Sequence, residues 1–201
     1  MWQRLPRLLR THARDAPEVE VTLVDPPPWG AIDMLQQRRV DLAAILVAEP
    51  DRFAHRHRAE FEIVDWGEVP LVAALPPVGE GERAVPDPLP IDYFRDAQMV
   101  VPRRTAAVPS LPEAVEETLR THDITPRGVR TVETIQTSVP LIEAGLACAI
   151  LPDPGRVSLS RFDMVVRRIE PEPVPLRALV LARAGASNDP VIRRFLGAVR
   201  S

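Results

Sequence analysis

The chain has 201 residues, of which 45% are hydrophobic and 26% are charged, and its formal net charge is −3 at pH 7. This composition supports one large domain or two smaller lobes, and it excludes a chain that is disordered throughout. Acidic and basic residues are mixed along the sequence, so no nucleic-acid surface is indicated within these residues. The single cysteine, Cys148, excludes an intrachain disulfide and a multi-cysteine metal site.

The first elements alternate between helix and strand. Leucines at helical spacing predict an amphipathic helix over Trp2–Ala16, which Pro17 ends. Polar and apolar residues then alternate over Glu18–Leu23, which is the pattern of a strand. A helix over Ala31–Arg39 leads to an apolar run, Asp41–Val47, typical of a strand buried on both faces of a parallel sheet. These segments predict a βαβ unit.

No segment of the sequence has the features of a membrane anchor or an export signal. Arginines interrupt the leucines near the N-terminus, and no apolar run approaches the roughly 20 residues needed to cross a bilayer. The lone cysteine fits a reducing compartment. We therefore expect a cytoplasmic protein.

A loop rich in proline, glycine and charge, Pro76–Pro90, divides the middle of the chain. Two apolar runs before it predict strands over Phe61–Val64 and Val69–Leu75. A second series of strands and helices follows it, with an S-x-x-E capping box at Ser110 and a helix-ending Gly145. The expected strands of this series are Met99–Val101, Val129–Val132 and Ala147–Leu151, and its helices are Leu111–His122 and Val139–Ala144.

The remaining elements suggest that the chain returns to its first lobe. Alternating residues predict strands over Met164–Ile169 and Leu176–Leu181, before a closing helix over Pro190–Val199. We expect two α/β lobes, with residues 1–75 and 152–201 forming lobe I and residues 76–151 forming lobe II. The chain would then cross between the lobes near residues 75 and 151.

Four stretches, taken in order, resemble the effector-binding domain of LysR-type transcriptional regulators. These stretches are Leu5–Leu9 with Ala16–Val21, Leu35–Ala43, Val69–Pro77 and Leu141–Pro152. The second is similar to the family's L-x-x-x-x-x-D-L-A run, and the last is similar to its V-A-x-G-x-G-I-A-L-L-P stretch. The resemblance covers nearly the whole chain. It implies two Rossmann-like lobes with a ligand cleft between them, as in type 2 periplasmic binding proteins.

The resemblance also implies partners. A small metabolite, which we expect to be anionic, would bind in the cleft without a cofactor or a metal. A homodimer or higher homo-oligomer would form side by side, with the helices Leu5–Arg14 and Ala114–Thr121 as contacts. DNA would be bound only through an N-terminal winged-helix segment. That segment, and the short strand with which the family's domain opens, are not visible in these residues, so we expect a fragment, a truncated gene model or a degenerate relative.

Three segments lie where a strand ends and a helix begins, which is where α/β sheets bind ligands. Trp29 follows the first predicted strand and could stack on an aromatic ligand, although such a residue more often covers a lobe edge. The second segment, Arg103-Arg104-Thr105, offers guanidinium groups and a hydroxyl to a carboxylate, or else lies in solvent. The third is Glu133–Ser138, in which Thr134, Ile135 and Gln136 are the expected ligand contacts and Thr137 or Ser138 could instead cap the next helix.

Other reactive side chains favour a structural interpretation. His55 and His57 form an H-x-H, but the neighbouring arginines repel a cation, so a solvated loop is the better interpretation of Arg52–Arg58. Cys148 lies in an apolar strand and is expected to be a buried structural thiol. The carboxylate pairs Glu80/Glu82 and Glu116/Glu117 show no sign of convergence.

The sequence thus favours a sensor without a catalytic apparatus. An enzyme on a similar two-lobed scaffold is disfavoured because no activated nucleophile or acid/base pair is found. A solute-binding protein is disfavoured by the absence of an export signal. The further possibility that the protein is a structural relic that binds no ligand stays open.

Overall fold

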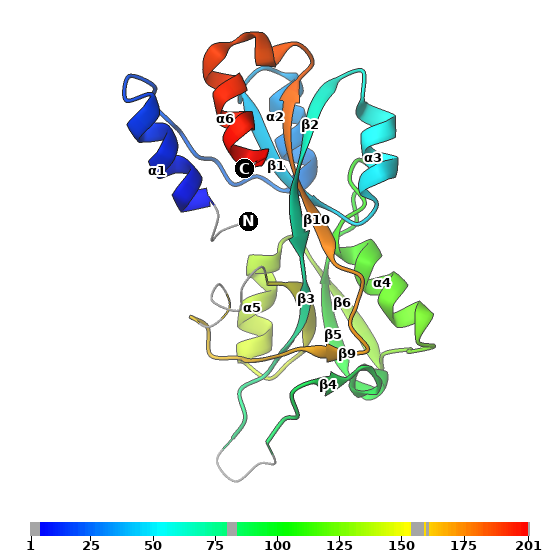
Figure 1. The fold of residues 1–201 in the computed structure, drawn as a ribbon. Coiled ribbons are helices and arrows are strands. Elements are labelled where there is room, and N and C mark those ends of the chain that lie inside the picture. Colours follow the sequence, from blue (N-terminus) through cyan, green and yellow to red (C-terminus); the bar gives the residue numbers. More distant parts are fainter. Residues whose placement is uncertain (1–4, 80–83, 154–158, 160, 201) are drawn as a thin grey trace. The chain divides into compact units, whose positions relative to one another are not determined.

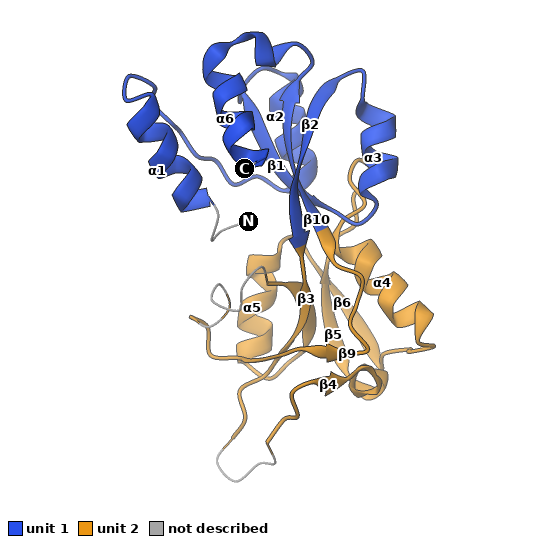
Figure 2. Ribbon diagram, in the orientation of Figure 1, with its two compact units in different colours: residues 1–68, 177–201 blue, residues 69–176 orange. Residues whose placement is uncertain are grey.

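The computed structural model describes residues 5–79, 84–153, 159 and 161–200, and these form two compact units (Figures 1 and 2). Unit 1 comprises residues 1–68 and 177–201, and unit 2 comprises residues 69–176. The predictions at Trp2, Glu80 and Glu82 lie outside the described residues. The sequence places the two boundaries at 75/76 and 151/152. The difference arises because residues 71–75, 165–167 and 169–170 form strands that pair with other strands of unit 2.

Unit 1 is a small antiparallel sheet with helices around it (Figure 1). Its strand order is β1-β10-β2, and β1 and β10 are antiparallel with Leu42 opposite Ala182. The elements are α1 (Leu5–Asp15), α2 (Pro28–Gln36), β1 (Leu42–Val47), α3 (Pro50–His57), β2 (Phe61–Val69), β10 (Leu176–Arg183), the short 3-10 helix η2 (Ala186–Asn188) and α6 (Pro190–Arg200).

The strand predicted over Glu18–Leu23 is wrong, and the βαβ unit built on it is wrong too. The segment has no regular secondary structure, and Val21, Leu23 and Val24 are 44%, 61% and 52% exposed. None of the described strands pairs with it, so its alternating pattern has no ladder to join. The residues Leu42–Val47 do form a strand, but β10, with which it pairs, runs antiparallel to it.

The loop predicted over Arg52–Arg58 is also wrong, because α3 covers Pro50–His57. Pro50 stands in the first turn, where its ring favours the helical backbone. Phe53, which is 4% exposed, anchors the helix, and the His57 ring lies 4.6 Å from the Phe53 ring and 5.9 Å from that of Phe61. The buried Phe53 side chain thus gives this charged helix an apolar contact with the rest of unit 1.

Unit 2 is built on strands that are covered by helices on both faces (Figure 1). The central strand β3 is buried at all five residues and lies between β7 and β8. Backbone bonds between Val100 and Cys148 (2.9 Å) and between Cys148 and Gln98 (2.9 Å) join β5 to the chain just before β7. The elements are β3 (Leu71–Leu75), β4 (Leu89–Pro90), the 3-10 helix η1 (Ile91–Asp96), β5 (Gln98–Pro102), α4 (Leu111–Thr121), β6 (Gly128–Val132), α5 (Ile135–Glu143), β7 (Ala149–Pro152), β8 (Val165–Arg167) and β9 (Ile169–Glu170).

Several of the local signals in the sequence are confirmed. Ser110 and Glu113 form the capping box of α4, with the Ser110 amide donating to Glu113 Oε2 at 2.7 Å. Gly145 ends α5 with φ of +73°, which a residue with a Cβ rarely adopts. At the start of α6, Asp189 Oδ1 accepts the Val191 amide at 2.7 Å.

Arg183 ties the end of β10 to the turn between α2 and β1. Its Nη1 donates to the backbone oxygens of Leu35 at 3.0 Å and Val40 at 2.8 Å, and its Nη2 lies 3.5 Å from Asp41. The Leu35 oxygen lies in the last turn of α2 and also accepts the Arg38 amide at 3.2 Å. The guanidinium therefore adds a charged donor to backbone oxygens at the end of a helix and in the turn that follows it.

We expect Arg183→Met to lower the free energy of unfolding by about 1–3 kcal/mol, because two carbonyls lose a charged donor while the aliphatic stem is kept. The matched control is Arg52→Met, whose exposed pair with Glu49 is worth roughly 0–1 kcal/mol. Urea denaturation followed by circular dichroism measures both. Equal midpoints for the two variants would show that the bonds of Arg183 do not stabilise the fold.

Candidate functional site

The candidate site is the edge of unit 2 at which the parallel strands β5 and β6 end. The strands pair in register from Gln98 opposite Gly128 to Pro102 opposite Val132. One residue further, the Arg103 amide donates to the Val132 oxygen at 2.7 Å. Because the two strands point the same way, the segments that follow them begin side by side.

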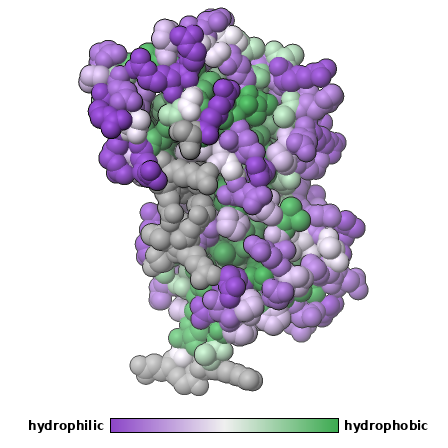
Figure 3. Space-filling model, in the orientation of Figure 1, coloured by the Kyte–Doolittle hydropathy of each residue, from purple (hydrophilic) through white to green (hydrophobic). Residues whose placement is uncertain are grey.

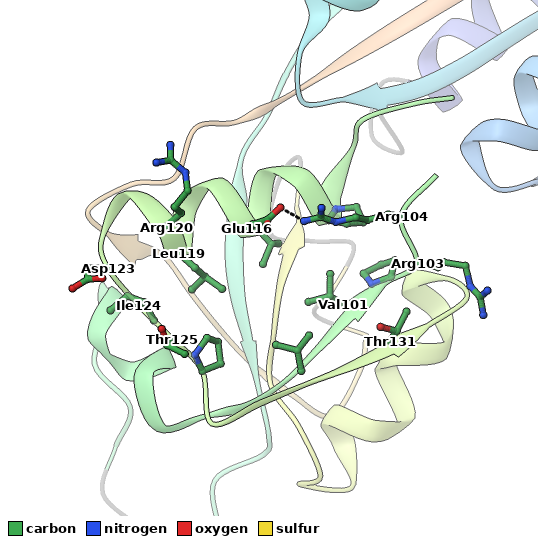
Figure 4. Close-up of a pocket in the computed structure, with 15 residues that line it drawn as sticks. Val101, Arg103, Arg104, Glu116, Leu119, Arg120, Asp123, Ile124, Thr125 and Thr131 are labelled. Carbon is green, nitrogen blue, oxygen red and sulfur yellow. Dashed lines mark hydrogen bonds and ion pairs between the residues drawn. The ribbon is translucent and has the colours of Figure 1, made fainter. Parts of the chain in front are cut away.

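The first of these segments carries two arginines that are both engaged in ion pairs. Arg103 Nη2 lies 2.5 Å from Glu133 Oε1, so the residue after β5 is joined to the residue after β6. Arg104 pairs with Glu116 of α4 (Figure 4). Thr105 is half-buried, and its hydroxyl donates to the Val108 oxygen at 3.5 Å. Neither guanidinium is free of a carboxylate in this structure.

The second segment forms the start of α5. Thr134 is the N-cap, its hydroxyl accepts the Thr137 amide at 3.3 Å, and Thr137 Oγ1 in turn accepts the Thr134 amide at 3.0 Å. The helix therefore begins at Ile135, earlier than the predicted Val139, and Thr134 caps it in place of Thr137 or Ser138. The amides of Ile135 and Gln136 belong to the first turn, where N–H groups have no acceptor within the helix.

A hollow of about 720 Å³ lies in the same unit, beside α4. We call it the α4–β6 groove. Strand residues line one side and apolar residues of α4 the other, while Arg104 turns towards Glu116 and Arg103 extends away from α4 (Figure 4). Its lining includes Val101, Pro102, Arg103, Arg104, Val115, Glu116, Leu119, Ile124, Val129 and Thr131.

Trp29 belongs to unit 1. It stands in the first turn of α2 and is 51% exposed. Figure 3 shows a largely hydrophilic surface on which apolar residues form small, separate areas. The indole of Trp29 is thus largely exposed to solvent.

The structure thus brings together some of the residues that the sequence singles out. Arg103 and Thr134 lie at one sheet edge, with Arg104, Thr105, Ile135 and Gln136 on the same two segments. Sequence reasoning missed the role of Glu133 as the partner of Arg103. Its position directly after β6, opposite an arginine directly after β5, is the signal that could have revealed it.

Among the described residues, no three His, Cys, Asp or Glu side chains gather in a group that could hold a metal ion. Cys148 is buried, as expected, and burial raises the pKa of its thiol to about 12. A thiol with that pKa carries almost no thiolate at neutral pH, so it is a poor nucleophile. Within the same residues, no helix is long and apolar enough to span a membrane.

A family model described as the LysR substrate binding domain matches residues 1–201. The chain belongs to the LysR substrate-binding domain family. This is a family of effector-binding domains of transcriptional regulators, and its fold is the one expected from the sequence, of the type 2 periplasmic-binding-protein kind. Its members are not enzymes as a class.

Similarity to individual members is distant in sequence and close in fold. A probable cat1 operon transcriptional activator of Acinetobacter lwoffii is 25% identical over 186 residues, which is 92% of this chain and 57% of the relative. This LysR substrate-binding domain therefore spans little more than half of that curated relative. The structure of CbnR, a LysR family transcriptional regulator, has a TM-score of 0.78 at 22% identity, covering 98% of this chain and 64% of CbnR. The effector-binding domain of BenM with benzoate has a TM-score of 0.72 at 14% identity, covering 98% and 84%.

Burial of Cys148 leads to a prediction about its reactivity. At pH 8 the folded domain should react with Ellman's reagent very slowly, whereas the domain unfolded in guanidinium should react fully, because only the unfolded thiol ionises near pH 9. Since the folded pKa is raised, the contribution of this thiol to stability is complete below pH 9 and falls as the pH rises towards 12. Rapid labelling of the native domain would contradict this placement.

Proposed function

We propose that this LysR substrate-binding domain senses a small carboxylate, which it binds at the carboxyl ends of β5 and β6 in unit 2. The observation that carries the proposal is the register of these strands, which places Arg103 beside the N-terminus of α5. A guanidinium and the amides of a helix start are complementary to a carboxylate. Thr105 and Gln136 add a hydroxyl and an amide on the same two segments.

The relatives support a sensing role. The curated relative is named as a transcriptional activator, and the structure of the BenM domain contains its effector benzoate. We infer that this domain is the ligand-sensing part of a regulator that acts on DNA in the cytoplasm, with the DNA contacts made elsewhere in that regulator. A ligand controls such a protein by preferring one of its conformations, so no turnover is required.

Ligand binding is testable by differential scanning fluorimetry with benzoate, succinate and other small carboxylates. A ligand present at 100 times its Kd stabilises the folded state by about 2.7 kcal/mol, which raises the Tm by roughly 2–4 °C per kcal/mol for a chain of this size. We expect Thr105→Val to reduce that shift. The matched control, Thr121→Val at the end of α4, should leave it unchanged. No shift with any carboxylate would contradict the proposal.

We further propose a homodimer in which α1 of one copy packs against α4 of the other. The exposed side chains of α1 include Arg7 and Arg10, while those of α4 include Glu116 and Glu117. The two helices therefore carry opposite charges. Beside α4, Val129 of the α4–β6 groove is 55% exposed and offers apolar surface to a partner. Apolar contact with a charged rim is the usual composition of such an interface.

The double variant Arg7→Glu/Arg10→Glu should shift the domain towards the monomer, because it places like charges opposite α4. Arg52→Glu/Arg56→Glu, the same charge change on the exposed face of α3, should leave the oligomeric state as it is. Analytical ultracentrifugation at several protein concentrations measures both. A stable dimer in the α1 variant would rule out this contact.

A further inference from the structure

The Arg103–Glu133 ion pair closes the edge that the proposed ligand would use. Glu133 directly precedes Thr134, the N-cap of α5, and its carboxylate lies 2.5 Å from the Arg103 guanidinium. The backbones of the two residues are fixed by the β5–β6 ladder and by the bond from the Arg103 amide to Val132. No rearrangement of the main chain is needed for the pair to form.

Glu133 offers Arg103 the same chemical group that a carboxylate ligand would offer. It is attached to the neighbouring strand, so its effective concentration at Arg103 is high compared with that of a free anion. The ligand must therefore displace this carboxylate, or share the guanidinium with it against like-charge repulsion. Both side chains are about two-thirds exposed, at 65% and 68%, so solvent screens the pair and displacement stays within reach of a small ligand.

We propose that Glu133 is a built-in competitor for Arg103 that sets the ligand concentration at which this unit responds. This inference rests on the proposed function, since it concerns the same site. Glu133 lowers the affinity for simple monocarboxylates and leaves the strands, the α5 cap and the shape of the edge unaffected. The Glu133 side chain therefore changes the affinity of the site for its ligand and does not change the fold.

The test is isothermal titration calorimetry, in which benzoate is titrated into the 201-residue chain and the dissociation constant is measured. Glu133→Gln keeps the size of the side chain and removes the competing charge, so benzoate should bind about threefold to fivefold more tightly. The gain should shrink as salt is raised, because screening weakens both the competition and the repulsion. The double variant Arg103→Gln/Glu133→Gln should show no gain over the wild type.

The matched control is Glu49→Gln, which breaks another exposed ion pair, that with Arg52 at 3.0 Å in unit 1. It changes the net charge by the same amount without altering a residue at the ends of β5 and β6, so benzoate affinity should stay within twofold of the wild type. If this control gained as much benzoate affinity as Glu133→Gln, the effect would be due to the overall charge of the protein, and the inference would be overturned.

The remaining outcomes separate the two proposals. Binding by the wild type with no gain in Glu133→Gln would overturn the competitor role and leave the proposed function in place. A gain that survives in the double variant would also overturn it, because Arg103 would then be uninvolved. No binding of benzoate or of any carboxylate in the fluorimetric panel, by wild type or Glu133→Gln, would overturn both.

Discussion

The parallel pairing of β5 with β6 is the constraint on which the candidate site depends. In-register pairing up to Pro102 opposite Val132 means that the next residues of both strands start from neighbouring points. An antiparallel arrangement would send the segment after β6 to the opposite edge, and Arg103 would then face no helix N-terminus. The location of the site is therefore set by the strand topology. The side chains at that location then determine what it can bind.

The rigid part of unit 2 lies behind this edge. The central strand β3 is wholly buried, and Ile142 of α5 and Met99 of β5 are completely inaccessible, so the helix is held against the strands by dense apolar contact. The charged residues at the edge are exposed and interact by weak, screened pairs. A stiff core thus supports a polar rim whose pairs can exchange partners at low cost, which is what a reversible binding site needs.

The sequence predicted the elements of unit 2 well because each one carries its own local signal. The capping box at Ser110 and the positive φ at Gly145 depend on a few neighbouring residues, and such signals do not require knowledge of distant partners. The two strand ends of the site were found for the same reason. The ion pair of Arg103 with Glu133 was not, because it joins side chains 30 residues apart and depends on which strands are neighbours.

The errors in unit 1 have the opposite cause. The alternating pattern of Glu18–Leu23 is a property of one segment, but a strand exists only where another strand accepts its hydrogen bonds, and no described strand does so. At α3, a single buried Phe53 outweighed a run of charged residues that the sequence alone places in solvent. In both cases, strand pairing or burial determines the secondary structure, and the local sequence pattern does not. By the same reasoning, the least predictable feature of the candidate site is the occupancy of Arg103. Residue type alone marks it as free to take a ligand, whereas the ladder supplies it with a carboxylate from its own chain.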